Sequence, residues 1–111
     1  MISLADLGFL KGAILETIVS TYDVDEAPNA APMGVRTDDT QRIVIGPYTS
    51  SSTYENLKSK KCAVVNVTSN PELYYYTAFK EANPESRIPT EWFEEAETVD
   101  APRLRMADTF V

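Results

Sequence analysis

The sequence predicts a mainly β fold with short helices, of the α+β class. Short segments rich in β-branched and aromatic residues alternate with polar turns, which is typical of antiparallel strands joined by short connections. Two helix starts, at Ser52 and at Asn70, interrupt these segments. The chain has 111 residues, enough for one modest core, so we expect residues 1–111 to form a single domain.

The first part of the chain is predicted to form an antiparallel meander of three strands. Their sequences are AILETIVSTY at 13–22, NAAPMGVR at 29–36 and QRIVIG at 41–46, and polar turns separate them. The second strand is unusual because Pro32 has no amide hydrogen and Gly34 has no side chain. Two interpretations stay open: an edge strand with a bulge, or a strand against which a ligand lies at residues 31–36.

A helix and a buried strand follow the meander. Ser52 and Glu55 have the S-x-x-E spacing of a capping box, which predicts a helix over residues 53–60 with Ser52 as its N-cap. The next segment, CAVVNVT at residues 62–68, is apolar on both faces. This pattern predicts a central, buried strand.

The last part of the chain adds helices and the beginning of a further strand. Asn70 as N-cap and Pro71 at the first helical position predict a helix with the sequence PELYYYTAFK. Thr90 is expected to cap a short acidic helix, EWFEEAE. The final segment, APRLRMADTFV, has the pattern of a strand that is only beginning.

Composition excludes several classes of function. The formal net charge of −7 repels phosphate backbones, so no nucleic-acid binding is expected. The absence of histidine excludes Ser-His-Asp and Cys-His catalysis and most zinc sites, and no calcium-binding loop is present. The single cysteine, Cys62, permits no intrachain disulfide and suits a cytoplasmic location. No apolar run approaches the roughly 18 residues that cross a membrane.

The serine- and threonine-rich loop at residues 49–53 is the leading candidate for a ligand site. It precedes a predicted helix, and helix N-termini hold phosphate with unpaired amides and the positive end of the dipole. The hydroxyls add donors, and Arg36 at the end of the second strand would add a positive charge. The alternative is that the loop is an ordinary one, with Ser52 present only as a cap.

Three segments resemble a known family. They are NAAPMGVR, the S-x-T-x-x-N-L spacing from Ser51 to Leu57, and VVNVTSNPEL. Together they are similar to an archaeal-type domain-of-unknown-function family of FMN-binding split barrels, which is related to the flavin reductase-like proteins. The resemblance covers residues 12–80 and, more weakly, APRLRMAD. It implies an antiparallel split β-barrel, usually a homodimer, with FMN at the subunit interface.

The resemblance also implies where the cofactor lies. The FMN phosphate is expected near the 49–53 loop, and its ring against residues 33–36. The residues implied to bind FMN are Met33, Gly34, Val35, Arg36, Thr49, Ser50, Ser51, Ser52, Thr53 and Asn56. Members of the family continue beyond the position of Val111, so the barrel is expected to be incomplete in this chain, with its C-terminal strands missing.

Three hypotheses for the function stay open. The first is an FMN-binding oxidoreductase-like protein, because the chain has no evident acid or base and a flavin would supply the redox chemistry. The second is a non-catalytic module that binds FMN or another phosphorylated ligand. The third is a structural or interaction fragment that pairs through its sheet edges. A homodimer is expected, because a half-closed sheet has unpaired edges.

Overall fold

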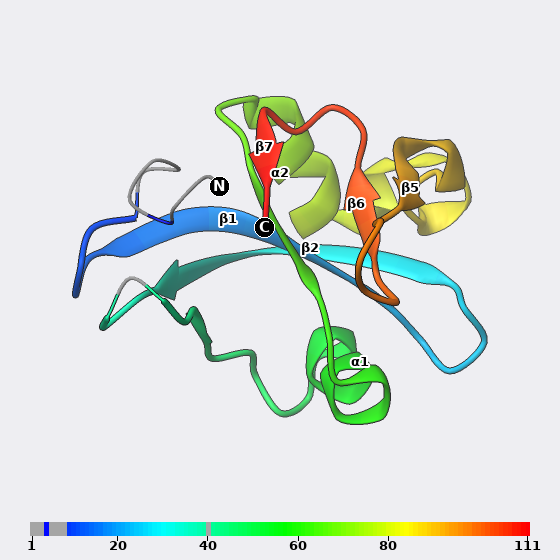
Figure 1. Ribbon diagram of the computed structural model, residues 1–111. Coiled ribbons are helices and arrows are strands. Elements are labelled where there is room, and N and C mark those ends of the chain that lie inside the picture. Colours follow the sequence, from blue (N-terminus) through cyan, green and yellow to red (C-terminus); the bar gives the residue numbers. More distant parts are fainter. Residues whose placement is uncertain (1–3, 5–8, 40) are drawn as a thin grey trace.

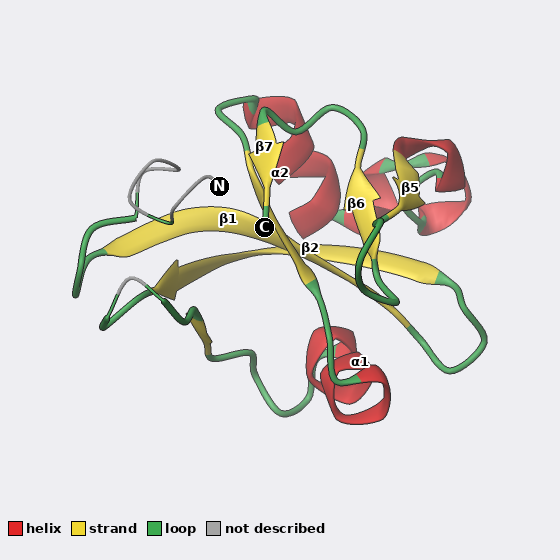
Figure 2. Cartoon of the chain, viewed as in Figure 1, coloured by secondary structure: helices red, strands yellow, loops and turns green. Residues whose placement is uncertain are grey.

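The structure is a computed structural model that describes residues 4, 9–39 and 41–111. Its strands are β1 Ile14–Tyr22, β2 Pro28–Arg36, β3 Val44–Ile45, β4 Val64–Val67, β5 Phe93–Glu95, β6 Pro102–Leu104 and β7 Thr109–Phe110. Its helices are α1 Ser52–Lys60 and α2 Pro71–Ala78, with short 3-10 helices at Lys80–Ala82, Pro84–Ser86 and Thr90–Trp92. Figure 2 shows how these elements alternate along the chain.

The strands form two antiparallel sheets. The larger sheet has the order β3-β2-β1-β4-β7, and the smaller consists of β5 and β6. The predicted class, mainly antiparallel β with short helices, is confirmed. Within the described residues the sheets do not close into a barrel, because β3 and β7 remain the two edges of the larger sheet.

The two α-helices lie on opposite faces of the larger sheet (Figure 1). Side chains alternate between the faces of a strand, so β1 contributes to both layers. Ile18 points toward α2, where it packs in a core cluster with Ala30, Leu73, Ile88, Phe93 and Leu104. Val19 points the other way, into a second cluster with Phe9, Val35 and Val65.

Strands β1 and β2 pair without interruption from Ile14 opposite Arg36 to Tyr22 opposite Pro28. The predicted bulge is therefore wrong. The edge assignment holds for most of the strand, because β3 pairs only with Val35 and Arg36. Among the described residues, positions 28–34 of β2 pair with no strand on their outer side, and this unpaired edge tolerates Pro32.

Gly34 has a packing explanation. A Cβ atom at this position would lie 2.6 Å from Cγ2 of Ile14 on the neighbouring strand. The glycine therefore makes room for a cross-strand side chain, which accounts for it without a ligand.

The start of α1 differs from the prediction by one residue. The N-cap is Ser51, not Ser52, and its hydroxyl accepts a hydrogen bond from the amide of Tyr54 at 3.1 Å. Ser51 has extended backbone angles, and its carbonyl accepts the first helical bond from Glu55. Residue N3 is therefore a tyrosine, so no capping box forms.

The start of α2 agrees with the prediction. The Asn70 side chain accepts a hydrogen bond from the amide of Glu72 at 2.9 Å, and Pro71 occupies the first turn. The helix ends at Ala78, two residues before its expected end at Lys80.

The acidic helix expected after Thr90 is wrong. Residues Thr90–Trp92 form a single 3-10 turn without a side-chain cap, and the chain then continues as β5. Phe93 is paired with Leu104 of β6, and both side chains are buried in the core. Burial of these two residues as a strand pair outweighs the local preference of the glutamates for a helix.

Two predicted strands are shorter in the structure. The segment 41–46 keeps only Val44–Ile45 as a strand, and the segment 62–68 keeps Val64–Val67. Cys62 therefore lies before β4. It is half-buried, and its thiol donates to the carbonyl of Asp100.

Candidate functional site

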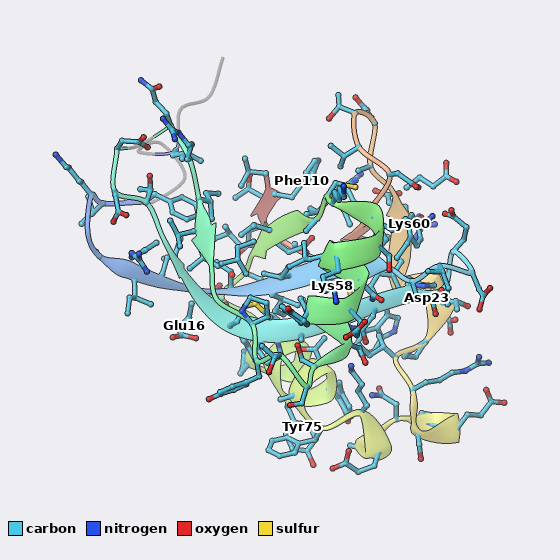
Figure 3. The ribbon with its side chains drawn as sticks, turned by 90° about the horizontal axis from the view of Figure 1, so that it is seen from below. Glu16, Asp23, Lys58, Lys60, Tyr75 and Phe110 are labelled. Atoms are coloured by element: carbon cyan, nitrogen blue, oxygen red, sulfur yellow. The ribbon has the colours of Figure 1, made fainter. Side chains whose placement is uncertain are left out.

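A cavity of about 410 Å³ lies between the β1–β2 turn and the N-terminus of α1. Its walls are formed by Asp23, Ala27, Pro28, Asn29, Ser50, Ser51, Ser52, Glu55 and Asn56. Figure 3 looks onto this face of the molecule, with α1 in front of the sheet and Asp23 beside it. The volume falls in the range of small-molecule sites, roughly 300–1,000 Å³.

The N-terminus of α1 forms one wall. Because Glu55 makes the first helical hydrogen bond, the amides of Ser52 and Thr53 precede the intrahelical ladder. Amides at this position point out of the helix start, where the dipole favours negative charge. This end of the cavity is suited to an anionic group.

Two side chains of α1 hold the helix against the rest of the fold. Near its middle, Asn56 is buried, and its Nδ2 donates to Oγ1 of Thr21 on β1 at 2.9 Å. At its C-terminal end, Lys60 donates to Glu26 in the β1–β2 turn and to Asp100 at 3.3 Å. The hydrogen bond to Glu26 is the main reason why the pKa of Lys60 is raised. The helix start is therefore fixed relative to the opposite wall.

The opposite wall is a turn organised by Asp23. Its Oδ1 accepts hydrogen bonds from the amides of Asp25 at 2.8 Å and Ala27 at 3.0 Å. This carboxylate is engaged in shaping the turn. The other carboxylate of the lining is Glu55, and no lysine or arginine belongs to the lining.

Two buried polar atoms near the cavity lack a hydrogen-bond partner within the described part of the chain. They are Nδ2 of Asn29, which lines the cavity, and Oγ1 of Thr53, in the first turn of α1. An unsatisfied buried donor costs free energy, so Nδ2 of Asn29 is suited to a ligand that completes its bonding. Together with the helix amides, this donor fits a group that carries acceptor oxygens, such as a phosphate.

The cavity brings together some of the residues expected to bind FMN. Ser50, Ser51, Ser52 and Asn56 line it, and Thr49 and Thr53 flank them in sequence. Residues 33–36 do not belong to its lining.

Arg36 lies at the far end of β2 from the cavity. It pairs with Ile14 and Val44, and eight residue steps of about 3.3 Å, roughly 26 Å, separate it from Pro28. Its Nε donates to Asp38 at 3.2 Å. Within one chain, the structure therefore does not bring Arg36 to the serine-rich loop.

Sequence reasoning missed Asn29, which lines the cavity, and its hydrogen-bond partner Lys80. Nζ of Lys80 donates to Oδ1 of Asn29 at 2.5 Å. Asn29 begins the NAAPMGVR segment, which carries the family resemblance, and this position was a signal that could have pointed to it. The PELYYYTAFK pattern predicts Lys80 as the last residue of a helix, but α2 ends at Ala78 and the chain turns there.

Comparison with known proteins identifies the family. Residues 15–110 match the model of the N-terminal domain of DUF447, a protein of unknown function. The chain belongs to this family. The membership agrees with the resemblance of the NAAPMGVR and VVNVTSNPEL segments.

Two solved structures are similar to this DUF447 domain. An FMN-bound protein of the DUF447 family from Methanosarcina mazei is 31% identical, with a TM-score of 0.79 over 97% of this chain. Flavoredoxin of Desulfovibrio vulgaris (Miyazaki F) is 19% identical, with a TM-score of 0.67 over 87% of this chain, and shares the fold. The DUF447 domain described here spans 52% of the first protein and 57% of the second.

The described residues include neither a helix suited to a membrane nor a cluster suited to a metal ion. None of their helices has the length and apolar character needed to cross a membrane. In the same part of the chain, no three histidine, cysteine, aspartate or glutamate side chains are grouped as a metal site would require.

Proposed function

We propose that this DUF447 domain binds FMN in the cavity between the β1–β2 turn and α1. The observation that carries the proposal is the cavity itself, where the N-terminus of α1 meets the unsatisfied Nδ2 of Asn29. The FMN-bound relative supports it, because it shares the family and 31% of its residues over nearly the whole of this chain.

Each wall of the cavity has a role in this proposal. The amides of Ser52 and Thr53 donate to the phosphate oxygens, and the hydroxyls of Thr49 and Ser50 add donors. Nδ2 of Asn29 donates to an acceptor of the ligand from the other side. Asn56 does not need to touch the ligand, because its bond to Thr21 already holds the helix start in position.

We further propose an oxidoreductase-like role. When bound, FMN supplies hydride or electron transfer, and the protein binds and orients it. The carboxylates of the cavity are a poor fit to hydrolytic catalysis, because Asp23 is engaged in its turn and Glu55 lies in the first turn of α1. A non-catalytic FMN-binding module has the same cavity and differs only in the lack of turnover.

A homodimer is also proposed. Positions 28–34 of β2 have a free outer edge in the described structure, and unpaired edges favour association. Aromatic side chains are exposed nearby on and after α2, where Tyr75 and Phe79 lie with their ring centroids 5.5 Å apart. Light scattering at micromolar concentration tests this, and a stable monomer would contradict it.

The absorbance spectrum of the domain tests whether it binds FMN. The spectrum is recorded on the purified domain and again after FMN has been added and the free FMN removed by gel filtration. A flavin band that stays with the protein supports the proposal, and its absence contradicts it. Anaerobic addition of NADH or NADPH then separates the two roles. Bleaching of the bound flavin band supports an oxidoreductase-like protein, whereas an unchanged band favours a binding module.

A further inference from the structure

Lys80 differs from the other basic side chains of the protein. All ten lysines and arginines lie in the described part of the chain. Besides Lys80, only Lys60 and Arg103 are half-buried, and both form ion pairs with carboxylates. Lys80 is half-buried without a carboxylate within 4.0 Å among the described residues.

The position of Lys80 follows from strand geometry. Asn29 is paired with Thr21, and paired residues project to the same face of the sheet. Thr21 bonds to Asn56 of α1, so Asn29 also belongs to the α1 face. Lys80 follows α2, which packs on the opposite face (Figure 1). Its side chain therefore reaches around the free edge of β2 to the cavity side.

Lys80 has unused hydrogen-bonding capacity beside Asn29, a residue that lines the cavity. An ammonium group has three N–H donors, and one is used by Asn29. Burial without a carboxylate is unfavourable for a cation, and burial lowers the pKa of Lys80. The cavity walls carry Asp23 and Glu55 and no basic side chain, so an anionic ligand there needs a positive charge from just outside the lining.

We propose that Lys80 is the cation that recognises the phosphate of the ligand, in the role that the sequence assigned to Arg36. Asn29 holds the ammonium group at the edge of the cavity, opposite the amides of Ser52 and Thr53. This inference rests on the proposed function, because FMN is the phosphate-bearing ligand.

Titrations with FMN and with riboflavin, which lacks the phosphate, test the inference. Lys80→Met removes the charge, Lys80→Gln keeps a donor for Asn29, and Lys80→Arg keeps the charge. We expect both neutral variants to bind FMN about tenfold or more weakly, since a charge-assisted hydrogen bond is lost. Their affinity for riboflavin should hardly change, and Lys80→Arg should restore most of the affinity for FMN.

Lys11→Met is the matched control. Lys11 is exposed and pairs with Thr37, beside the far end of β2, so the same loss of charge should leave FMN binding unchanged. The inference is overturned if Lys80→Met binds FMN as tightly as the parent, or if it loses FMN and riboflavin equally. The second result would mean that Lys80 contacts the flavin ring or supports the fold rather than binding the phosphate. If the parent binds no FMN, the proposed function fails first and this inference falls with it.

Discussion

The side chain of Asn66 joins the two sheets through the amide of Leu104. Its Oδ1 accepts a hydrogen bond from that amide at 2.9 Å, and its Nδ2 donates to the carbonyl of Ile18 at 2.8 Å. Both Asn66 and Leu104 are fully buried. One polar side chain in the middle of β4 thus fixes where β6 packs on the larger sheet.

Replacing Asn66 by leucine should destabilise the fold strongly. The change leaves the buried amide of Leu104 and the carbonyl of Ile18 without these side-chain bonds, and we expect a loss of about 2–3 kcal/mol in the free energy of unfolding. Urea unfolding followed by circular dichroism measures it. A loss below about 0.5 kcal/mol would show that the junction does not depend on Asn66.

Ser51 and Ser52 form a matched pair that tests the start of α1. Ser51→Ala removes the cap on the amide of Tyr54 and should cost about 1 kcal/mol of stability. Ser52→Ala should cost less than about 0.5 kcal/mol, because Ser52 already lies inside the helix. Thermal or urea unfolding of the two variants decides between the caps. The reverse order would restore the assignment made from the S-x-x-E spacing.

The contact between Asn56 and Thr21 should be measurable as a coupling energy. Asn56→Ala and Thr21→Val each break the 2.9 Å hydrogen bond that holds α1 on β1. In a double-mutant cycle, we expect the two changes to be non-additive by about 0.5–1.5 kcal/mol. Strictly additive losses would mean that α1 is held by its other contacts alone.

The stability of the domain should fall at alkaline pH. Burial raises the pKa of Tyr22 above its ordinary value of 10.0, and the carboxylates of Glu95 and Glu26 raise it further. A raised pKa contributes stability that is present below the unfolded value and is lost as the pH rises through the folded value. Lys60 also has a raised pKa and acts in the same direction.

Tyr22→Phe tests this account of the alkaline loss. The variant has no group to ionise at this position, so its stability should decline less between pH 8 and pH 11 than that of the parent. Urea midpoints across this range provide the measurement. Parallel curves for parent and variant would contradict a contribution from Tyr22.

The sequence was informative where local chemistry decides the structure. The β-branched segments predicted β1 and β2 to within a residue or two, and Asn70 with Pro71 predicted the start of α2. The family also followed from short segments, because NAAPMGVR and VVNVTSNPEL lie inside the matched range.

The sequence was misleading where a contact between residues far apart in the chain decides the local structure. Phe93 becomes part of a strand because Leu104 pairs with it, and no local pattern in EWFEEAE indicates that partner. Likewise, Lys80 reaches Asn29 across 51 positions of sequence, and neither segment alone indicates this contact. Arg36 was an attractive candidate by sequence, but the length of β2 places it away from the loop.

Blocking the cavity and measuring FMN binding tests whether FMN lies between the β1–β2 turn and α1. Ala27 lines the cavity in the β1–β2 turn, whereas Val24 in the same turn is 69% exposed and does not line it. FMN titration of Ala27→Trp and Val24→Trp compares the same new side chain inside and outside the proposed site. We expect Ala27→Trp to lose FMN binding and Val24→Trp to bind like the parent. Parental binding by Ala27→Trp would contradict the placement of FMN in this cavity.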